Sequence, residues 1–208
     1  MENNLRLKGN TREKIIEAAA AEFAGSGLAG ARIDRIAELA GVNKAMIYYH
    51  FASKEKLYQA IIDEHVERVS LALQGVVGSD MDLETALLTL AKTYHAAFGG
   101  HQDLVSMLLH ELADGGAHLK QALQSMIWGK GIPNRLMMLL EGGIGEGRFR
   151  AFDPRQAMIS FAGMNLFYLF MSPIATSLWE IEHENEFLEN RPAQIVDLFL
   201  HGIQSRPA

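Results

Sequence analysis

The sequence of 208 residues contains no cysteine. A disulfide framework and thiolate chemistry are therefore excluded, and the composition fits a reducing compartment. The first ten residues, MENNLRLKGN, are polar and lack the apolar run of a signal peptide, so we expect a cytoplasmic protein. A chain of this length can form one large or two small domains with a substantial core.

The sequence also lacks an excess of positive charge, since its formal net charge is −6. The charge is uneven along the chain. Residues 1–58 hold nine Lys and Arg against seven Asp and Glu, a balance of +2, which leaves −8 for the other 150 residues. This distribution permits a protein that contacts phosphate with its N-terminal part only.

Recognisable catalytic motifs are missing as well. The segment His110–Asp114 resembles a zinc-peptidase pattern, but Asp114 replaces the second histidine, and Gly115-Gly116 would break the helix that further ligands such as His118 require. Gly145–Arg148 is rich in glycine without the surroundings of a phosphate loop. No Ser-His-Asp or Cys-His arrangement can be argued. We therefore expect no enzyme activity, no metal and no cofactor.

The segment Ile33–Phe51 predicts two short helices joined by a tight turn. Gly41 follows the apolar face of the first helix, in the position of a left-handed C-terminal residue. Asn43 is a suitable N-cap of the second helix, which turns Ile47 and Phe51 inward. The remaining side chains of this helix are exposed or flanking.

Two interpretations of this segment are open from spacing alone. A short helix that exposes a lysine, two tyrosines and a histidine has suitable groups for a DNA major groove, where Lys and Tyr donate to phosphates. The alternative is a surface pair of helices whose aromatic side chains are half-buried against neighbours.

The run AGVNKAMIYYHFASKEKLY at residues 40–58 resembles the helix-turn-helix signature of the TetR family of bacterial transcriptional repressors. The resemblance covers roughly residues 11 to 60, and its residue types recur at fixed spacing. It implies an all-α fold with an N-terminal three-helix head that contains the helix-turn-helix, and a larger helical domain for ligand binding and dimerisation. We place the DNA-binding domain at residues 1–56 and the effector-binding and dimerisation domain at residues 57–208.

The function implied is a sequence-specific transcriptional regulator, a repressor released by a small apolar ligand. It would bind a near-palindromic double-stranded operator as a homodimer. One departure from the family is Arg32, which stands where a Thr or Ser N-cap is usual. Arginine cannot accept a hydrogen bond, so we expect a lost cap and a phosphate contact instead. The predicted DNA-binding residues are Arg32, Asn43, Lys44, Ala45, Met46, Tyr48, Tyr49, His50 and Lys54.

Helices flank this motif on both sides. We expect a first helix capped by Asn10 or Thr11 that ends near Gly25–Gly27, preceded or opened by Arg6, Lys8 and Arg12, which are solvated or form a basic arm. Ser53 should cap a fourth helix that extends to about Gly75. Its apolar stripe consists of Tyr58, Ile62, Val66, Val69 and Leu73.

The larger domain should contain helices over Leu83–Phe98, Asp103–Ala113 and Ala117 to about Leu140, separated by glycine pairs that include Gly142-Gly143. Methionines and aromatics in this part suit a hydrophobic ligand, although such residues are more often plain core. The candidate pocket residues are Tyr94, Phe98, Met107, His110, Trp128, Asn165 and Tyr168.

Asp153 and Pro154 mark a clear helix start. The following 21 residues, Ile159–Trp179, carry no charge. Polar residues and a proline interrupt this run, so we interpret it as a helix buried on two sides, by its own domain and by a second subunit, rather than as a membrane span. A last helix is predicted from near Arg191 to Gly202, after an acidic connector, EIEHENEFLEN. Predicted dimer contacts are Phe161, Gly163, Met171, Ile195 and Phe199.

The alternative function is a helical small-molecule-binding protein or enzyme whose helix-turn-helix is structural only. Loss of DNA binding on substitution of Lys44 and Tyr49 would separate it from the regulator. A membrane-attached protein that uses Ile159–Trp179 is a further alternative.

Overall fold

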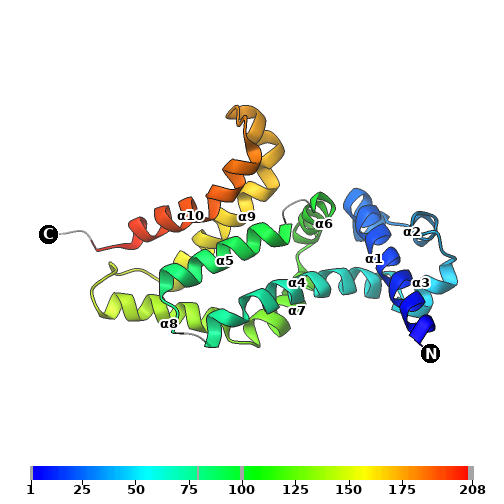
Figure 1. Cartoon of the computed structure of the whole chain (residues 1–208), viewed down its shortest axis with the longest axis horizontal. Coiled ribbons are helices and arrows are strands. Elements are labelled where there is room, and N and C mark those ends of the chain that lie inside the picture. Colours follow the sequence, from blue (N-terminus) through cyan, green and yellow to red (C-terminus); the bar gives the residue numbers. More distant parts are fainter. Residues whose placement is uncertain (1, 79, 99–100, 206–208) are drawn as a thin grey trace. The chain divides into compact units, whose positions relative to one another are not determined.

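The computed structural model describes residues 2–78, 80–98 and 101–205, without the side chains of residues 2–10, 78 and 173. These ranges are helical, apart from turns and an isolated antiparallel bridge between Phe149 and Gln204 (Figure 1). The all-α prediction is confirmed. None of the described helices combines the length and apolar character needed to cross a membrane. The helices are α1 (Glu2–Gly30), α2 (Ile33–Ala40), α3 (Lys44–Phe51), α4 (Lys54–Gly78), α5 (Leu83–Phe98), α6 (Gln102–Ala113), α7 (Ala117–Leu123), the π-helix η1 (Gln124–Trp128), α8 (Ile132–Gly145), α9 (Pro154–Leu178) and α10 (Glu184–Ile203).

The chain forms two compact units. The N-terminal unit combines Met1–Glu67 with Gly100–Leu123, and the C-terminal unit combines Arg68–Gly99 with Gln124–Ala208. Helices α1, α2, α3, α6 and α7 therefore belong to the first unit, whereas α5, η1, α8, α9 and α10 belong to the second. Helix α4 contributes residues to both. The functional division after residue 56 stays a prediction.

Helix α1 packs on α2 and α6 through a buried stripe that includes Ile15, Ala19 and Phe23. It begins at Glu2, earlier than the predicted cap at Asn10 or Thr11, and no proline in residues 2–10 prevents the helix from extending toward the N-terminus. The side chain of Asn10 lies outside the described part. The helical path is interrupted at Gly27, whose φ is 64° and ψ 177°, as the predicted end near Gly25–Gly27 requires.

The turn between α2 and α3 has the predicted caps. Gly41 is left-handed (φ 64°, ψ 34°), and its N–H bonds to the last carbonyls of α2. The side chain of Asn43 accepts a hydrogen bond of 3.0 Å from the Met46 N–H, which caps α3. Ile47 and Phe51 are buried, as predicted. Both ends of this short helix are therefore held by local hydrogen bonds and its middle by apolar packing.

Helix α4 starts as predicted, since Ser53 Oγ accepts a 3.1 Å hydrogen bond from the Lys56 N–H. It ends at Gly78 rather than near Gly75. The predicted apolar stripe of this helix is buried along its whole length: Tyr58, Ile62, Val66, Val69 and Leu73.

A buried carboxylate joins α6 to α7. Glu111 is only 3% exposed and accepts hydrogen bonds from the backbone N–H groups of His118 (2.8 Å) and Leu119 (3.1 Å), which caps α7. Its other oxygen lies 3.2 Å from His118 Nδ1. Burial, together with the neighbouring Glu111 carboxylate, raises the pKa of Tyr58. Glu111 and His118 thus form a structural cap, and the described side chains contain no cluster of potential metal ligands.

The C-terminal unit is a layered arrangement in which α10 packs on α5 and α9, and α9 also contacts α5 and α8. The rings of Phe161 and Phe199 meet edge to face, 5.1 Å apart, in its core. Asp153 caps α9 as predicted, by accepting a 2.9 Å hydrogen bond from the Arg155 N–H.

Two predictions about element boundaries after residue 116 are wrong. Helix α10 begins at Glu184, so most of the predicted acidic connector is its first half, and the predicted start near Arg191 lies inside it, next to Pro192. Glutamate and leucine have high helix propensity. This stabilisation outweighs the loss of the one backbone hydrogen bond that Pro192 cannot donate. The predicted helix over 117–140 divides into α7, η1 and α8, with a left-handed Gly131 (φ 75°) before α8.

Gly142 and Gly143 do not end a helix, because α8 continues through both to Gly145. The two glycines differ in their surroundings. A Cβ atom at Gly143 would lie 2.2 Å from ring carbons of the buried Phe149, whereas a Cβ at Gly142 meets nothing within 4 Å. Gly143 therefore allows the close approach of Phe149 to α8.

This difference predicts opposite effects of the same substitution at adjacent positions. Gly143→Ala should lower the free energy of unfolding by about 1–3 kcal/mol, since Phe149 must move. Gly142→Ala should raise it by about 0.5–1 kcal/mol through helix propensity. Urea denaturation of both variants measures the two effects. Equal changes would contradict the packing of Phe149 on Gly143.

Candidate nucleic-acid interface and ligand region

Helix α3 carries the predicted contact surface. Burial of Ile47 and Phe51 on one side leaves Tyr48 50% exposed and Tyr49 66% exposed on the other. Lys44 and Ala45 are also exposed, at the start of the helix. A small residue beside a lysine and two tyrosines lets a helix approach a groove closely while it donates hydrogen bonds to phosphates.

Lys44 forms an ion pair with Asp34 of α2. The hydrogen bond between them lowers the pKa of Asp34 and raises the pKa of Lys44, so both groups stay charged near neutral pH. Both side chains are more than half exposed, so solvent screens the pair and its contribution to stability is small. Lys44 can therefore exchange this partner for a phosphate at little cost.

Arg32 has the features expected from its unusual position. It precedes α2 in an extended conformation and provides no side-chain cap, as predicted. Its backbone N–H donates to Glu22 Oε1 at 3.0 Å, which fixes the main chain. The side chain is exposed and forms no ion pair with the described residues. The guanidinium is thus directed to solvent beside the N-terminus of α2.

The remaining predicted contacts are more enclosed. Lys54 donates hydrogen bonds to the carbonyls of Ala29 (3.2 Å) and Ala31 (3.0 Å), which ties α4 to the chain after the kink of α1. One of its three N–H donors stays available. Met46 and His50 are half-buried, and the His50 ring packs against those of Tyr49 and Phe51.

Of the three basic side chains predicted to precede or open the first helix, the structure describes that of Arg12. Arg12 forms an ion pair with Glu64 of α4, and its guanidinium lies 5.3 Å from the centre of the Phe51 ring. This arginine therefore braces α1 against neighbouring helices of its unit. The side chains of Arg6 and Lys8 lie outside the described part.

The predicted pocket residues fall into different units. Met107 is fully buried and His110 exposed in the N-terminal unit. The other five belong to the C-terminal unit, where Asn165 and Tyr168 are buried on α9 and Trp128 is 56% exposed. Tyr94 and Phe98 are half-buried on α5, and burial raises the pKa of Tyr94. The structure brings the helices of Tyr94, Asn165 and Tyr168 into contact.

The predicted dimer contacts are mostly internal. Phe161, Ile195 and Phe199 are buried in the protomer itself and have almost no area left for a second copy. Met171 is half-buried, and Gly163 is exposed with nothing within 4 Å of an added Cβ. Other large apolar side chains of α9 are exposed instead, and they share one face of the helix with Gly163. These are Ile159, Phe167, Ile174 and Leu178.

Sequence reasoning missed Arg191 of α10. Its guanidinium carbon lies 4.5 Å from the centre of the Tyr168 ring, and its Nη2 donates to the Met164 carbonyl at 3.1 Å. A signal was present, because Arg191 is the single Lys or Arg between Arg155 and Arg206. An isolated cation in a largely apolar and acidic stretch is a candidate for a specific role.

Comparison with known proteins agrees with this arrangement. The family model of bacterial regulatory proteins of the tetR family matches residues 15–61, and that of the tetracyclin repressor-like C-terminal domain matches residues 84–198. The second match alone covers more than half of the chain.

Similar proteins include two named repressors. The HTH-type transcriptional repressor NicS of Pseudomonas putida is 31% identical over 141 residues, which are 67% of this chain and 66% of that protein. The HTH-type transcriptional repressor SCO4008 of Streptomyces coelicolor is 41% identical over 101 residues, which are 49% of each chain. The match thus spans less than two thirds of the length of either relative.

The fold is also that of solved structures. The crystal structure of HlyIIR, a hemolysin II transcriptional regulator, superposes with a TM-score of 0.68 at 21% identity, covering 96% of this chain and 99% of that one. The two family matches agree with the observed helix-turn-helix and with the helical C-terminal unit. The chain therefore belongs to the tetR family of bacterial regulatory proteins.

Proposed function

We propose that the protein is a sequence-specific DNA-binding transcriptional regulator that acts as a repressor. The observation that carries the proposal is α3, which is capped by Asn43, anchored by Ile47 and Phe51, and exposes Lys44, Ala45, Tyr48 and Tyr49 together. This helix would enter the major groove, as the second helix of a helix-turn-helix does. The relatives NicS and SCO4008 are both named transcriptional repressors, which supports the same function.

Phosphate contacts would hold the unit on the duplex. Arg32 supplies a guanidinium that no described residue pairs with, beside the N-terminus of α2, and Lys44 supplies an ammonium group whose partner, Asp34, is exposed. Lys54 would contribute its remaining donor. Tyr48, Ala45 and Met46 would face the bases or the wall of the groove, with Asn43, Tyr49 and His50 beside them.

The working form would be a homodimer on a near-palindromic operator. The exposed stripe of Ile159, Phe167, Ile174 and Leu178 on α9 favours self-association, because large exposed apolar side chains that share one helix face are typical of an interface. Gly163 in the same stripe permits close approach of a second helix. Two copies of α3 related by the dimer axis would then read successive major grooves.

Release from DNA would follow from a small ligand bound in the C-terminal unit. Helix α4 begins among residues of the N-terminal unit and ends among residues of the C-terminal unit, so it can transmit a change between them. A ligand that prefers the state unable to bind DNA by a few kcal/mol would act as an inducer.

Selection of bound duplexes from a random DNA pool by the purified full-length protein tests this function. We expect enrichment of an inverted repeat. The double variant Lys44→Ala, Tyr49→Ala should lose the enrichment, whereas Arg155→Ala, at an exposed arginine of α9, should keep it. An unchanged motif in the double variant would show that α3 is not the reading helix.

A lack of enrichment would have one of two explanations: a co-purified ligand holds the protein in the state that does not bind DNA, or the helix-turn-helix is structural only. One further step separates them. The selection is repeated after unfolding, dialysis and refolding, which removes a co-purified ligand. Recovery of the inverted repeat would support the regulator, and continued absence with a correctly folded dimer would refute it.

The role of Arg32 has its own test. Arg32→Ser should weaken binding to the selected duplex and reduce the slope of log K against log salt by about 0.9 for each phosphate that the variant no longer neutralises. Thermal stability should not fall, since serine can cap α2. Arg155→Ser is the control, with an expected unchanged slope. If Arg32→Ser kept the wild-type slope, the arginine would not contact phosphate.

The dimer surface can be tested without DNA. Phe167→Asp places a charge in the exposed stripe of α9 and should convert the dimer to monomer in sedimentation at micromolar concentration. Leu109→Asp changes a leucine of α6 that is 43% exposed and should leave the mass unchanged. A dimer that survives Phe167→Asp would mean that another surface forms the interface.

A further inference from the structure

The exposed side of α9 carries its residues in a symmetric order. Ile159 and Leu178 lie at its two ends, and Gly163 and Ile174 lie one turn further in. Both pairs are centred on the same point of the helix, between residues 168 and 169. Among the described side chains from residue 159 to 178, the exposed ones are Ile159, Ser160, Gly163, Phe167, Ile174, Ser177 and Leu178.

Gly163 and Ile174 are the two members of this face that differ most in size. Gly163 has no side chain, and a Cβ atom added there meets nothing within 4 Å. Ile174 is large, apolar and more than half exposed. The two lie eleven positions apart, close to three turns of about 3.6 residues each, so they fall on one line along the helix. The exposed face therefore has a notch towards one end and a protruding side chain towards the other.

A second copy of α9 can cover this face in two directions. In a parallel pair, Gly163 would lie against Gly163 of the second copy and Ile174 against Ile174. One level would then contain a gap and the other a steric clash. In an antiparallel pair about a two-fold axis at the common midpoint, each Ile174 lies against Gly163 of the second copy. Both notches are then filled at once, and Ile159 meets Leu178.

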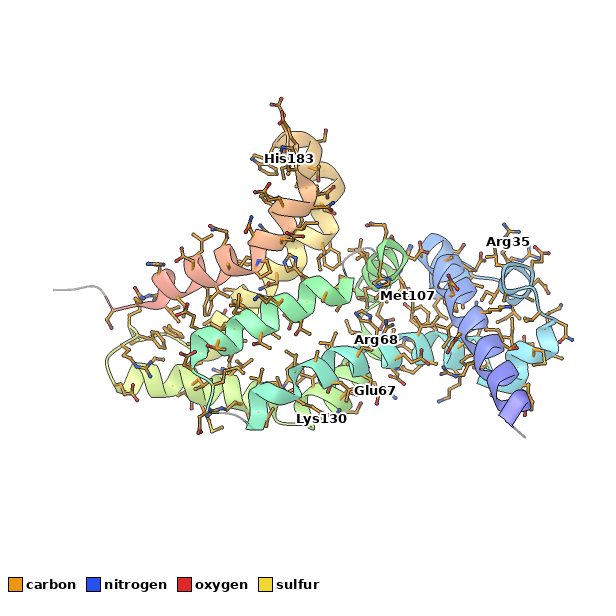
Figure 2. The ribbon with its side chains drawn as sticks, in the orientation of Figure 1. Arg35, Glu67, Arg68, Met107, Lys130 and His183 are labelled. Atoms are coloured by element: carbon orange, nitrogen blue, oxygen red, sulfur yellow. The ribbon has the colours of Figure 1, made fainter. Side chains whose placement is uncertain are left out.

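The acidic segment that follows α9 favours the same direction. It surrounds His183, which Figure 2 labels at the end of α9 and α10. A parallel pair would bring the two acidic segments together, where like charges repel. In the antiparallel pair the two Leu178 positions are about 30 Å apart. The screening length at physiological salt is only about 8 Å. The exposed acidic residues of this segment are Glu180, Glu182, Glu184, Glu186 and Glu189.

We propose that two copies of the chain pair through antiparallel α9 helices, with Ile174 of each copy packed into the notch at Gly163 of the other. The inference rests on the homodimer of the proposed function, and it adds the direction and the register of the pair. A shift by one helical turn would place Ile174 against Ile159 or Phe167 of the second copy and leave the notch empty. The register is therefore set by the one position without a side chain.

Introduced thiols report this pairing directly, because the chain contains no cysteine. The full-length double variant Gly163→Cys, Ile174→Cys is purified in reduced form and then oxidised with diamide at micromolar concentration. We expect a covalently linked dimer on a non-reducing gel, since a disulfide joins residues whose Cα atoms are about 4.4–6.8 Å apart.

The control variants use the same face of α9. Gly163→Cys and Ile174→Cys as single variants should stay unlinked, because identical residues are about 16 Å apart in the antiparallel pair. The double variant Ile159→Cys, Ile174→Cys is one turn out of register and should link far more slowly than Gly163→Cys, Ile174→Cys. Linkage of the single variants would show a parallel pair, and faster linkage of the shifted pair would show another register. Either result would overturn the proposal.

An exchange of the two side-chain sizes gives a second readout without thiols. Gly163→Ile fills the notch while Ile174 remains, and should raise the dissociation constant of the dimer about tenfold or more. The protomer itself has room for the new side chain. Adding Ile174→Ala moves the large side chain to the other position and should bring the constant back to within about threefold of the wild type. Sedimentation equilibrium measures both constants. A double variant no tighter than Gly163→Ile would overturn the packing of Ile174 on Gly163.

Failure of this pairing and failure of the proposed function give different results. A wild-type chain that sediments as a monomer would refute the homodimer and the pairing together. A wild-type dimer in which Gly163→Cys, Ile174→Cys does not link would refute the antiparallel register alone. The selection of an inverted repeat from random DNA would still test the regulator.

Discussion

Two apolar side chains, Ile47 and Phe51, hold α3 in place, and the rest of the candidate DNA surface depends on them. A helix of eight residues is not stable by itself in water. Full burial of two such side chains contributes about 1.5–3 kcal/mol each, and the Asn43 cap adds about 1 kcal/mol. Because both anchors lie on one side, every other side chain of α3 is exposed or flanking. The packing that stabilises the helix therefore also selects which residues can reach a groove.

The C-terminal unit follows a different principle, because one of its helices leaves an apolar face uncovered in the single protomer. Helix α9 buries Phe161 and Tyr168 against its own unit and exposes Phe167 and Ile174 on the opposite side. Asn165 and Tyr168 of α9 and Arg191 of α10 each have a buried polar atom without a hydrogen-bond partner among the described residues. An apolar stripe that is exposed to water is unfavourable in isolation. A second copy of the chain, as proposed above, would cover it.

The head of the protein could be predicted from the sequence because its signals are local. A left-handed glycine at Gly41, caps at Asn43 and Ser53, and apolar spacing in α3 and α4 each depend on neighbours within a few residues. The same holds for Asp153 at the start of α9.

Features that depend on contacts between distant segments could not be predicted in this way. A helix that is apolar all round does not reveal which face its own unit covers, so the sequence predicts Phe161, Ile195 and Phe199 as dimer contacts although the protomer buries them. The predicted start of the last helix, near Arg191, is an internal position of α10. The polar atoms that are buried without a hydrogen-bond partner among the described residues include His95 Nε2, Asn165 Oδ1 and Arg191 Nε. They lie on three different helices and have no pattern along the chain.

The kink at Gly27 has a consequence for how this gene can vary. Its φ of 64° with ψ of 177° is a conformation that residues with a Cβ essentially do not adopt. Every change in the first or second base of a glycine codon replaces glycine by a residue with a Cβ or by a stop codon. Every such replacement at this position therefore either strains the backbone or truncates the chain. The surrounding residues, Ser26 and Leu28, face no such restriction. In populations of related genes, codon 27 should therefore accumulate only third-base changes, whereas codons 26 and 28 should also accumulate changes that replace the amino acid.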